Sequence, residues 1–194
     1  MKKFFRLAVL VMALGFGYGV YHALHQPTVG GVPFAQLPPE IQTRRREEAK
    51  TLTDQVGDVA RAARHKEHKP FELTATEDQL NTLLQDRIKT GNLPVNNLRL
   101  GLQSGQIILQ GDAKYKGITA PATLSGTLEP RDGGVRFEVQ SLTIGGFPAP
   151  DGWKDKIERT VGQNLDKFFR GERDAHIDTV KIEPGQLTVT GTTG

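Results

Sequence analysis

Hydrophobic residues recur every three or four positions in three segments of this chain, which predicts three amphipathic helices. We expect them at residues 40–66, 76–90 and 152–169. The first is highly charged, with a narrow apolar stripe of Ala49, Leu52, Val56, Val59, Ala60 and Ala63. The apolar stripe of the third contains Trp153, Ile157, Val161, Leu165 and Phe168. The second has the clearest start, because Thr76 and Gln79 stand at the spacing of a capping box.

From Val95 to Ile144 apolar and polar residues alternate, which predicts four β-strands. Short turns containing glycine separate them, so an antiparallel meander with one apolar and one solvated face is expected. A short strand is expected at Phe71–Thr74, and a closing hairpin turns at Pro184-Gly185. The pattern therefore predicts an α+β fold with an antiparallel sheet of about six strands.

The start of the chain has a different pattern. After the basic residues Lys2, Lys3 and Arg6, residues 7–24 contain no charged side chain except that of His22. Such a helix would be about 27 Å long, close to the ~30 Å hydrocarbon core of a bilayer. Basic residues before the apolar run and none directly after it orient the N-terminus inward. We therefore expect residues 1–25 to be a single-pass anchor and the rest of the chain to be extracytoplasmic.

A cleaved signal peptide is the competing interpretation of this start. Its apolar region would be the shorter stretch 7–16, with Gly17 and Gly19 at the positions that a signal peptidase reads. The apolar run continues past that site, which favours the uncleaved anchor. In both cases the chain is exported. Residues 26–39 are rich in proline and glycine and are expected to form a tether between the membrane and the domain.

Charge and composition exclude several classes of protein. The chain has 25 basic and 22 acidic residues, and the surplus of three equals the number of basic residues before the apolar run. The exported part is therefore neutral, so the basic isoelectric point does not indicate a nucleic-acid partner. The absence of cysteine excludes disulfides and thiolate chemistry. An exported domain without disulfides must be stabilised by its hydrophobic core.

Few residues suggest catalysis, and we expect no enzyme, no cofactor and no metal. Ser104, Ser125 and Ser141 are the only serines, and none stands in a nucleophile-elbow motif. His176 is expected to be a surface residue. A lipid hydrolase is the weakest of the functional hypotheses, with the serines and His176 as the residues to test.

The apolar face of the sheet leaves two possibilities open. It can be an ordinary core closed by the 152–169 helix, which the pattern alone favours, or an incompletely covered groove for an acyl chain. Small residues on this face fit both. The candidate groove lining is Ile107, Leu109, Ala113, Ala122, Leu124, Leu128, Phe137, Val139, Ile144, Trp153, Ile157, Val161 and Phe168. A candidate partner surface on the charged helix consists of Leu52, Val56, Val59 and Ala63.

Two short motifs resemble known families. The stretch from Phe71 to Leu84, FELTATEDQLNTLL, resembles the strand and T-E-x-x-L-N-x-L-L helix that open the YpmS-like proteins, which are membrane-anchored and bacterial. The stretch from Leu142 to Pro150, LTIGGFPAP, and a closing strand with Gly185 look like that group and the LmeA-like exported proteins. Both groups are similar to the tubular lipid-binding superfamily. The resemblance implies a curved antiparallel sheet wrapped on a long helix and a lipid-handling role, and it transfers no catalytic residue.

The leading hypothesis is therefore a bacterial protein of the cytoplasmic membrane whose extracytoplasmic α+β domain, residues 70–194, binds lipid between sheet and helix. The alternative is a non-enzymatic scaffold protein of the cell envelope. It would contact a protein partner through the charged helix at residues 40–66. This helix occupies the segment 40–69, between the tether and the α+β domain. This helix and the small number of strands are departures from the resembled families.

Overall fold

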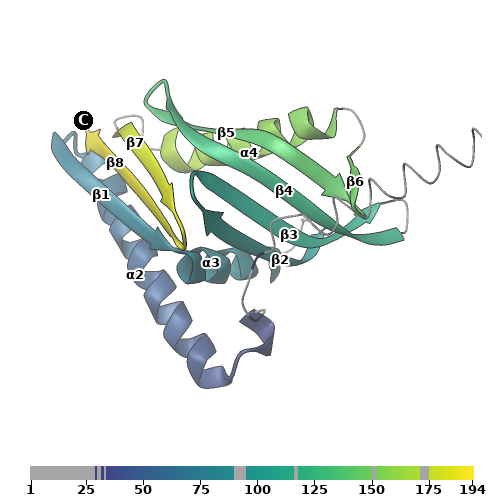
Figure 1. The fold of residues 1–194 in the computed structure, drawn as a ribbon. Coiled ribbons are helices and arrows are strands. Elements are labelled where there is room, and N and C mark those ends of the chain that lie inside the picture. The colour runs from purple at the N-terminus through teal and green to yellow at the C-terminus, as the bar shows by residue number, and fades with distance from the viewer. Residues whose placement is uncertain are drawn as a thin grey trace, which may run out of the picture.

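The alternating segments form two antiparallel sheets in the described part of the chain, which corrects the expectation of one sheet. The computed structural model describes residues 29, 32, 34–89, 95–115, 118–149, 152–170 and 175–194. The larger sheet is a meander in the order β2-β3-β4-β5-β6 (Figure 1). Its strands are β2 (Val95–Gln103), β3 (Gln106–Tyr115), β4 (Ile118–Arg131), β5 (Gly134–Ile144) and β6 (Phe147–Pro148). The predicted four-stranded meander is thus confirmed, with β6 added at its edge.

The smaller sheet joins the two ends of the domain in the order β1-β8-β7. Its strands are β1 (Lys69–Thr76), β7 (Ala175–Glu183) and β8 (Gln186–Thr193). Lys69 lies opposite Thr193, which is 124 positions away. Alternation along a strand defines its two faces but not its neighbour. For that reason the sequence pattern could not show that these strands form a sheet of their own.

The three predicted helices are present: α2 (Pro39–Arg64), α3 (Glu77–Lys89) and α4 (Trp153–Arg170), with a short 3₁₀ turn, η1 (Phe34–Gln36), before them. The capping box is confirmed, since the amide of Gln79 donates to Thr76 Oγ1 at 3.3 Å and the amide of Thr76 donates to Gln79 Oε1 at 2.9 Å. None of the helices in the described residues is long and apolar enough to cross a bilayer. The predicted anchor, residues 1–25, lies outside the described residues.

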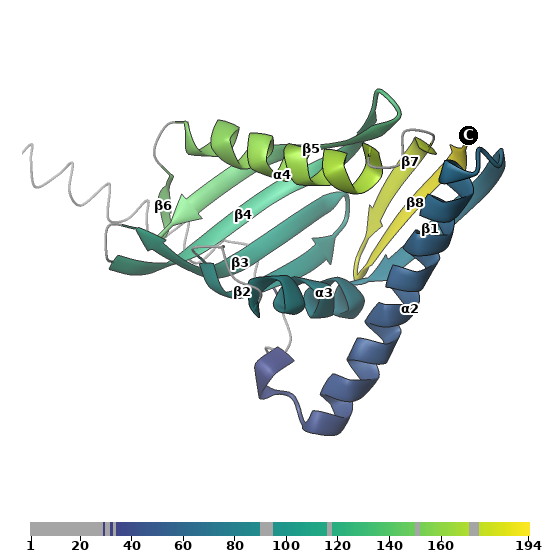
Figure 2. The same cartoon turned by 180° about the vertical axis from the view of Figure 1, so that it is seen from behind.

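The helices have different places around the sheets. Helices α3 and α4 lie on the same side of the five-stranded sheet, α3 along β2 and α4 along β5 (Figure 2). Helix α2 packs on α3 and on the three-stranded sheet. Two apolar clusters result. One lies between the five-stranded sheet, α3 and α4, and the other, around Val135, Ile177 and Val189, joins the two sheets.

Part of the expected tether is docked on the domain. Val29 is 6% exposed and its side chain lies over Gly101. Its amide donates to Gln110 Oε1 at 3.0 Å, which fixes it to the outer face of β2 and β3. Phe34 is 5% exposed, with the guanidinium of Arg46 5.4 Å from the centre of its ring. Val29 and Phe34, which belong to the segment expected to be a tether, are therefore held by the domain.

Candidate functional site

The inner face of the five-stranded sheet is a continuous apolar floor. One rung, from β2 to β5, consists of Leu100, Leu109, Leu124 and Leu142, which lie opposite one another in the strand register. The next rung toward β6 has Gly111, Ala122 and Ile144. On β3 and β4 large side chains therefore give way to small ones along the same face, whereas β5 keeps a large one, Ile144; we call this second rung the small-residue rung.

Helix α3 closes the β2 edge of this floor with polar side chains. Asn81 forms two hydrogen bonds with Leu100: Nδ2 donates to the carbonyl oxygen and Oδ1 accepts from the amide, both at 2.7 Å. One turn away on either side, the Leu102 amide donates to Glu77 Oε2 at 2.9 Å and Gln85 Nε2 donates to the Leu98 carbonyl at 2.9 Å. These bonds satisfy backbone groups that an edge strand would otherwise present to solvent or to another chain.

Helix α4 closes the opposite edge in the same way. The Val139 amide donates to Glu158 Oε1 at 2.8 Å, and Lys154 Nζ donates to the Gln140 carbonyl at 3.0 Å. Both bonds lie on β5 beyond the short pairing with β6, which involves only Thr143 and Ile144 of β5. The two helices are therefore attached to opposite edges of the sheet, and β3 and β4 lie between them (Figure 2).

The apolar residues of the two helices are only partly covered. Leu80 and Leu84 of α3 and Trp153, Ile157 and Val161 of α4 pack against the floor, yet all five are half-buried. Leu109 of the floor is half-buried as well. Part of the apolar surface of these six side chains is therefore exposed to solvent.

The predicted lining residues with described side chains lie on this sheet face or on the side of α4 that packs against it. Ile107, Leu124, Phe137 and Val139 are buried within the cluster. The half-buried ones are Leu109, Ala113, Ala122, Leu128, Ile144, Trp153, Ile157 and Val161. The side chain of Phe168 lies outside the described part of the chain. Sequence reasoning missed the α3 wall, although Glu77, Asn81 and Gln85 recur at every fourth position, as edge-contacting polar residues on one helix face do.

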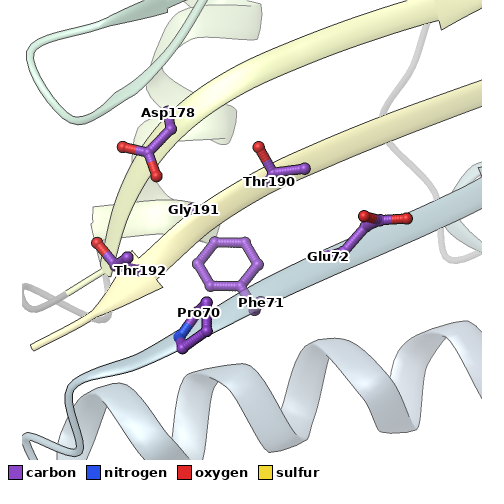
Figure 3. Close-up of a pocket in the computed structure, with 7 residues that line it drawn as sticks. All are labelled: Pro70, Phe71, Glu72, Asp178, Thr190, Gly191 and Thr192. Atoms are coloured by element: carbon purple, nitrogen blue, oxygen red, sulfur yellow. The ribbon is translucent and has the colours of Figure 1, made fainter.

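Two open hollows lie away from this face, around Phe71 of β1. One has a volume of about 410 Å³ and is lined by Pro70, Phe71, Glu72, Asp178, Thr190, Gly191 and Thr192 (Figure 3). In it the ring of Phe71 lies against Gly191, where an added Cβ would be 2.7 Å from the ring. The hollow thus combines one aromatic ring with two acidic side chains, an arrangement unsuited to an anionic head group.

The other hollow, of about 470 Å³, lies between α2 and β1. Its cations are already paired, since Arg61 Nη1 lies 2.9 Å from Asp58 Oδ1 and Lys69 Nζ lies 2.6 Å from Glu67 Oε2. The hydrogen bond and positive charge of Lys69 lower the pKa of the Glu67 carboxyl below its ordinary value. Paired charges of this kind neutralise each other at the surface and leave little attraction for an anion.

The candidate partner surface on α2 is largely used within the chain. Leu52 is 5% exposed and Ala63 is fully buried, while Val56 and Val59 are half-buried. The stripe faces the chain's own α3 and three-stranded sheet. Leu52 and Ala63 therefore do not offer a free surface, which removes the observation on which the scaffold hypothesis rested. Binding of a protein partner stays a prediction, and no surface of α2 is assigned to it.

The residues considered for catalysis are not assembled into a site. Ser125 Oγ and Ser141 Oγ lie 2.7 Å apart, as neighbours on β4 and β5, on the face opposite to the leucine rung. His176 belongs to β7 of the other sheet, where its Nε2 lies 3.6 Å from Asp178 Oδ1. Within the residues that the structure describes, no group of three or more potential ligands could hold a metal ion.

Comparison with known proteins adds one finding. The family model described as LmeA-like phospholipid-binding matches residues 69–192. This range begins at the first residue of β1 and ends within β8, so it includes both sheets, α3 and α4 and leaves out α2. No curated protein matches the chain.

Proposed function

Because this chain belongs to the LmeA-like phospholipid-binding family, we propose that its domain binds a phospholipid whose acyl chains lie on the inner face of the five-stranded sheet, between α3 and α4. We further propose that residues 1–25 anchor the protein in the bacterial cytoplasmic membrane and that the domain lies on the extracytoplasmic side. The observation that carries the lipid site is the partial exposure of Leu80, Leu84, Trp153 and Ile157 on two helices that line one apolar floor.

Burial of acyl-chain surface on this face, counted from water, offsets the cost of association to a large extent. Removing one methylene group from water gains about 0.8 kcal/mol. A chain with about ten methylenes on the floor would gain roughly 8 kcal/mol, which is within the 4–15 kcal/mol range estimated for the cost of association. A lipid with two chains gains more for the same cost. The proposal therefore includes a preference for diacyl lipids over single-chain lipids.

We assign no side chain of the domain to the phosphate group of the lipid. Two charged residues of α4 at one edge of the floor, Glu158 and Lys154, are engaged with the backbone of β5. Recognition by the apolar chains alone predicts weak discrimination between head groups. We expect phosphatidylethanolamine and phosphatidylglycerol to bind with similar affinity.

The single tryptophan offers a direct test of the site. Trp153 is the only tryptophan of the chain and lies at the start of α4, against the floor. Phospholipid with brominated acyl chains, added to the full-length protein in detergent, should quench its fluorescence in a saturable way. The matched control is a Trp153→Phe, Phe71→Trp variant, which moves the only tryptophan to the three-stranded sheet. Quenching of the control but not of the native protein would contradict the proposed location.

A pair of substitutions on β4 tests occupancy by a second measurement. Ala122 lies on the floor and Thr119 lies on the opposite face of the same strand. Ala122→Phe should lower the amount of phospholipid that co-purifies with the full-length protein several-fold, because the ring fills space above the small-residue rung. Thr119→Phe adds the same side chain outside the floor and should leave the amount unchanged. Absence of co-purifying phospholipid from the native protein would refute the lipid-binding function itself.

A further inference from the structure

The described part of the chain has three exposed large hydrophobic side chains, Val32, Ile118 and Phe147, with 56%, 70% and 53% of their surface exposed. Ile118 and Phe147 belong to the five-stranded sheet, at the end where β6 lies, away from the three-stranded sheet (Figures 1 and 2). Val32 lies outside this sheet, in the segment before η1 and three residues from Val29. Exposed apolar groups that gather in one region of a surface mark an interaction site.

The strand register places Ile118 and Phe147 on the inner face. Ile118 is two residues from Ala120 and four from Ala122, so all three point to the side of Leu124. Phe147 lies opposite Ile144, which lies opposite Ala122. Phe147 therefore extends the rung of Ala122 and Ile144 onto β6, and Ile118 lies four residues further along β4, at the end of the sheet. We call Ile118 and Phe147 the apolar tip.

The apolar tip is held by regular structure. Phe147 follows a two-residue turn in which Gly145 and Gly146 have φ angles of 61° and 84°, the positive values that a tight hairpin turn requires. The Gly145 amide donates to the Pro121 carbonyl at 2.7 Å, which ties this hairpin to β4. Ile118 begins β4 and lies opposite the last residue of β3. Both side chains are thus presented to solvent by the sheet itself.

The length of chain before Val29 limits how far this end of the domain can be from a membrane. The apolar run ends at Leu24, five residues before Val29. Five residues span at most about 17 Å when fully extended. The Val29 amide is hydrogen-bonded to the side chain of Gln110. Gln110 is five residues before Tyr115, the last residue of β3, which is a distance of roughly 17 Å along the strand. If the run spans the bilayer, as proposed above, the apolar tip can therefore reach the surface of that bilayer.

We propose that the apolar tip docks on the bilayer that holds the N-terminal segment, so that the open end of the inner face meets the acyl-chain region of the membrane. A lipid could then move between bilayer and floor along a continuous apolar surface, without passing its chains through water. This inference rests on the proposed lipid-binding function and anchor, and it adds the place at which lipid enters and the surface that the domain presents to the membrane.

Site-directed spin labelling tests the docking, because the chain contains no cysteine and each introduced one is unique. Nitroxide labels would be attached to Ile118→Cys and Phe147→Cys variants of the full-length protein in phosphatidylethanolamine/phosphatidylglycerol vesicles. The matched control is Glu129→Cys. Glu129 lies on the same strand as Ile118 but eleven residues away from it, a distance of roughly 36 Å along the strand. Collision rates with oxygen and with a water-soluble nickel complex then report the depth of each label.

Docking predicts that the oxygen-to-nickel collision ratio is several-fold higher at positions 118 and 147 than at position 129. Equal ratios at the three positions, or a full-length protein that does not stay with the vesicles, would overturn the proposal. A second readout is lipid transfer from vesicles to the protein. The double variant Ile118→Asn, Phe147→Asn should slow this transfer several-fold relative to the native protein. Unchanged transfer by a correctly folded double variant also argues against docking.

These results separate the docking from the lipid-binding function. Labels that enter the bilayer in a protein that binds no phospholipid would support the apolar tip and refute the lipid site. Bound phospholipid together with labels that remain in water would support the lipid site and refute the apolar tip. The two proposals therefore fail on different measurements.

Discussion

The two hydrogen bonds between Asn81 and Leu100 provide a quantitative test of how the α3 wall is attached. Both bonds are 2.7 Å long and Leu100 is buried, so water cannot easily replace the amide of Asn81. The variant Asn81→Leu keeps side-chain size, raises helix propensity and removes both bonds, together with the bond that Asn81 Nδ2 donates to the Glu77 carbonyl. It leaves a backbone donor and a backbone acceptor of β2 without partners from α3.

The expected cost follows from the number of groups left without a partner. Each hydrogen bond contributes about 0.5–1.5 kcal/mol net, and a buried group left unsatisfied costs about 1–3 kcal/mol. For the two groups of Leu100 we expect a loss of about 2–4 kcal/mol in the free energy of unfolding. This is a large part of the 5–15 kcal/mol typical of a domain. For a chain of this size, it corresponds to a fall in Tm of roughly 5–15 °C.

Urea unfolding of the full-length protein in detergent, followed by Trp153 fluorescence, measures this loss. The control Gln55→Leu makes the same kind of change at an exposed position of α2 and should stay within about 0.5 kcal/mol of the native protein. An Asn81→Leu variant as stable as this control would refute the reasoning that polar side chains of α3 hold the edge of the sheet.

The variant Asn81→Asp adds a dependence on pH. The new carboxylate could still accept from the Leu100 amide but would face the Leu100 carbonyl oxygen, which it repels unless it is protonated. Its pKa in the folded protein should therefore be raised above the ordinary value of about 3.9. The folded state then binds more protons than the unfolded one, so stability falls as pH rises through this window. A variant equally stable at pH 4 and pH 7, relative to the native protein, would contradict this.

Three further predictions concern single sites. Gly191→Ala should destabilise the protein by about 1–3 kcal/mol, because the new methyl group would lie 2.7 Å from the Phe71 ring and also meet backbone; a thermal melt measures this. Gly57→Ala, in α2 with no atom within 4 Å of the added Cβ, should instead stabilise by about 0.5–1 kcal/mol in the same melt. Lys69→Met should raise the pKa of Glu67 toward its ordinary value, since the hydrogen bond from Lys69 is the largest cause of its lowering. An NMR titration of Glu67 in the native protein and in the Lys69→Met variant would measure this change. The Glu67–Lys69 interaction stabilises the folded state at pH values above the ordinary carboxyl pKa, and this stabilisation is lost as pH falls through the lowered pKa of Glu67.

Much of the local structure could be predicted from the sequence. The capping box at Thr76 and Gln79 marked the start of α3 within one residue, because its hydrogen bonds join residues three positions apart. The alternation from Val95 to Ile144 identified the strands of the meander, because its hairpins pair neighbouring segments. It also identified which residues share the inner face, including Leu109, Ala122 and Leu124.

It was harder to predict what covers an apolar face than to predict which residues lie on it. The apolar stripe of α2 suggested a partner, yet Leu52 and Ala63 are covered by the chain's own α3 and three-stranded sheet. The sequence shows that such a stripe needs a neighbour, but not whether that neighbour belongs to the same chain. The proline- and glycine-rich segment had the same difficulty, since the docking of Val29 on Gln110 joins residues 81 positions apart.

The sequence by itself determined the helices, the strands of the meander, the α+β class and the residues on its apolar face. These depend on hydrogen bonds and side-chain periods that act over a few residues. Only the tertiary structure decided that β1 pairs with β8 in a second sheet, that Asn81 and Glu158 attach α3 and α4 to opposite edges, and that apolar side chains of both helices stay half-buried there. Each of these depends on the pairing of segments distant in the chain, and the local pattern of apolar and polar residues is compatible with several such pairings.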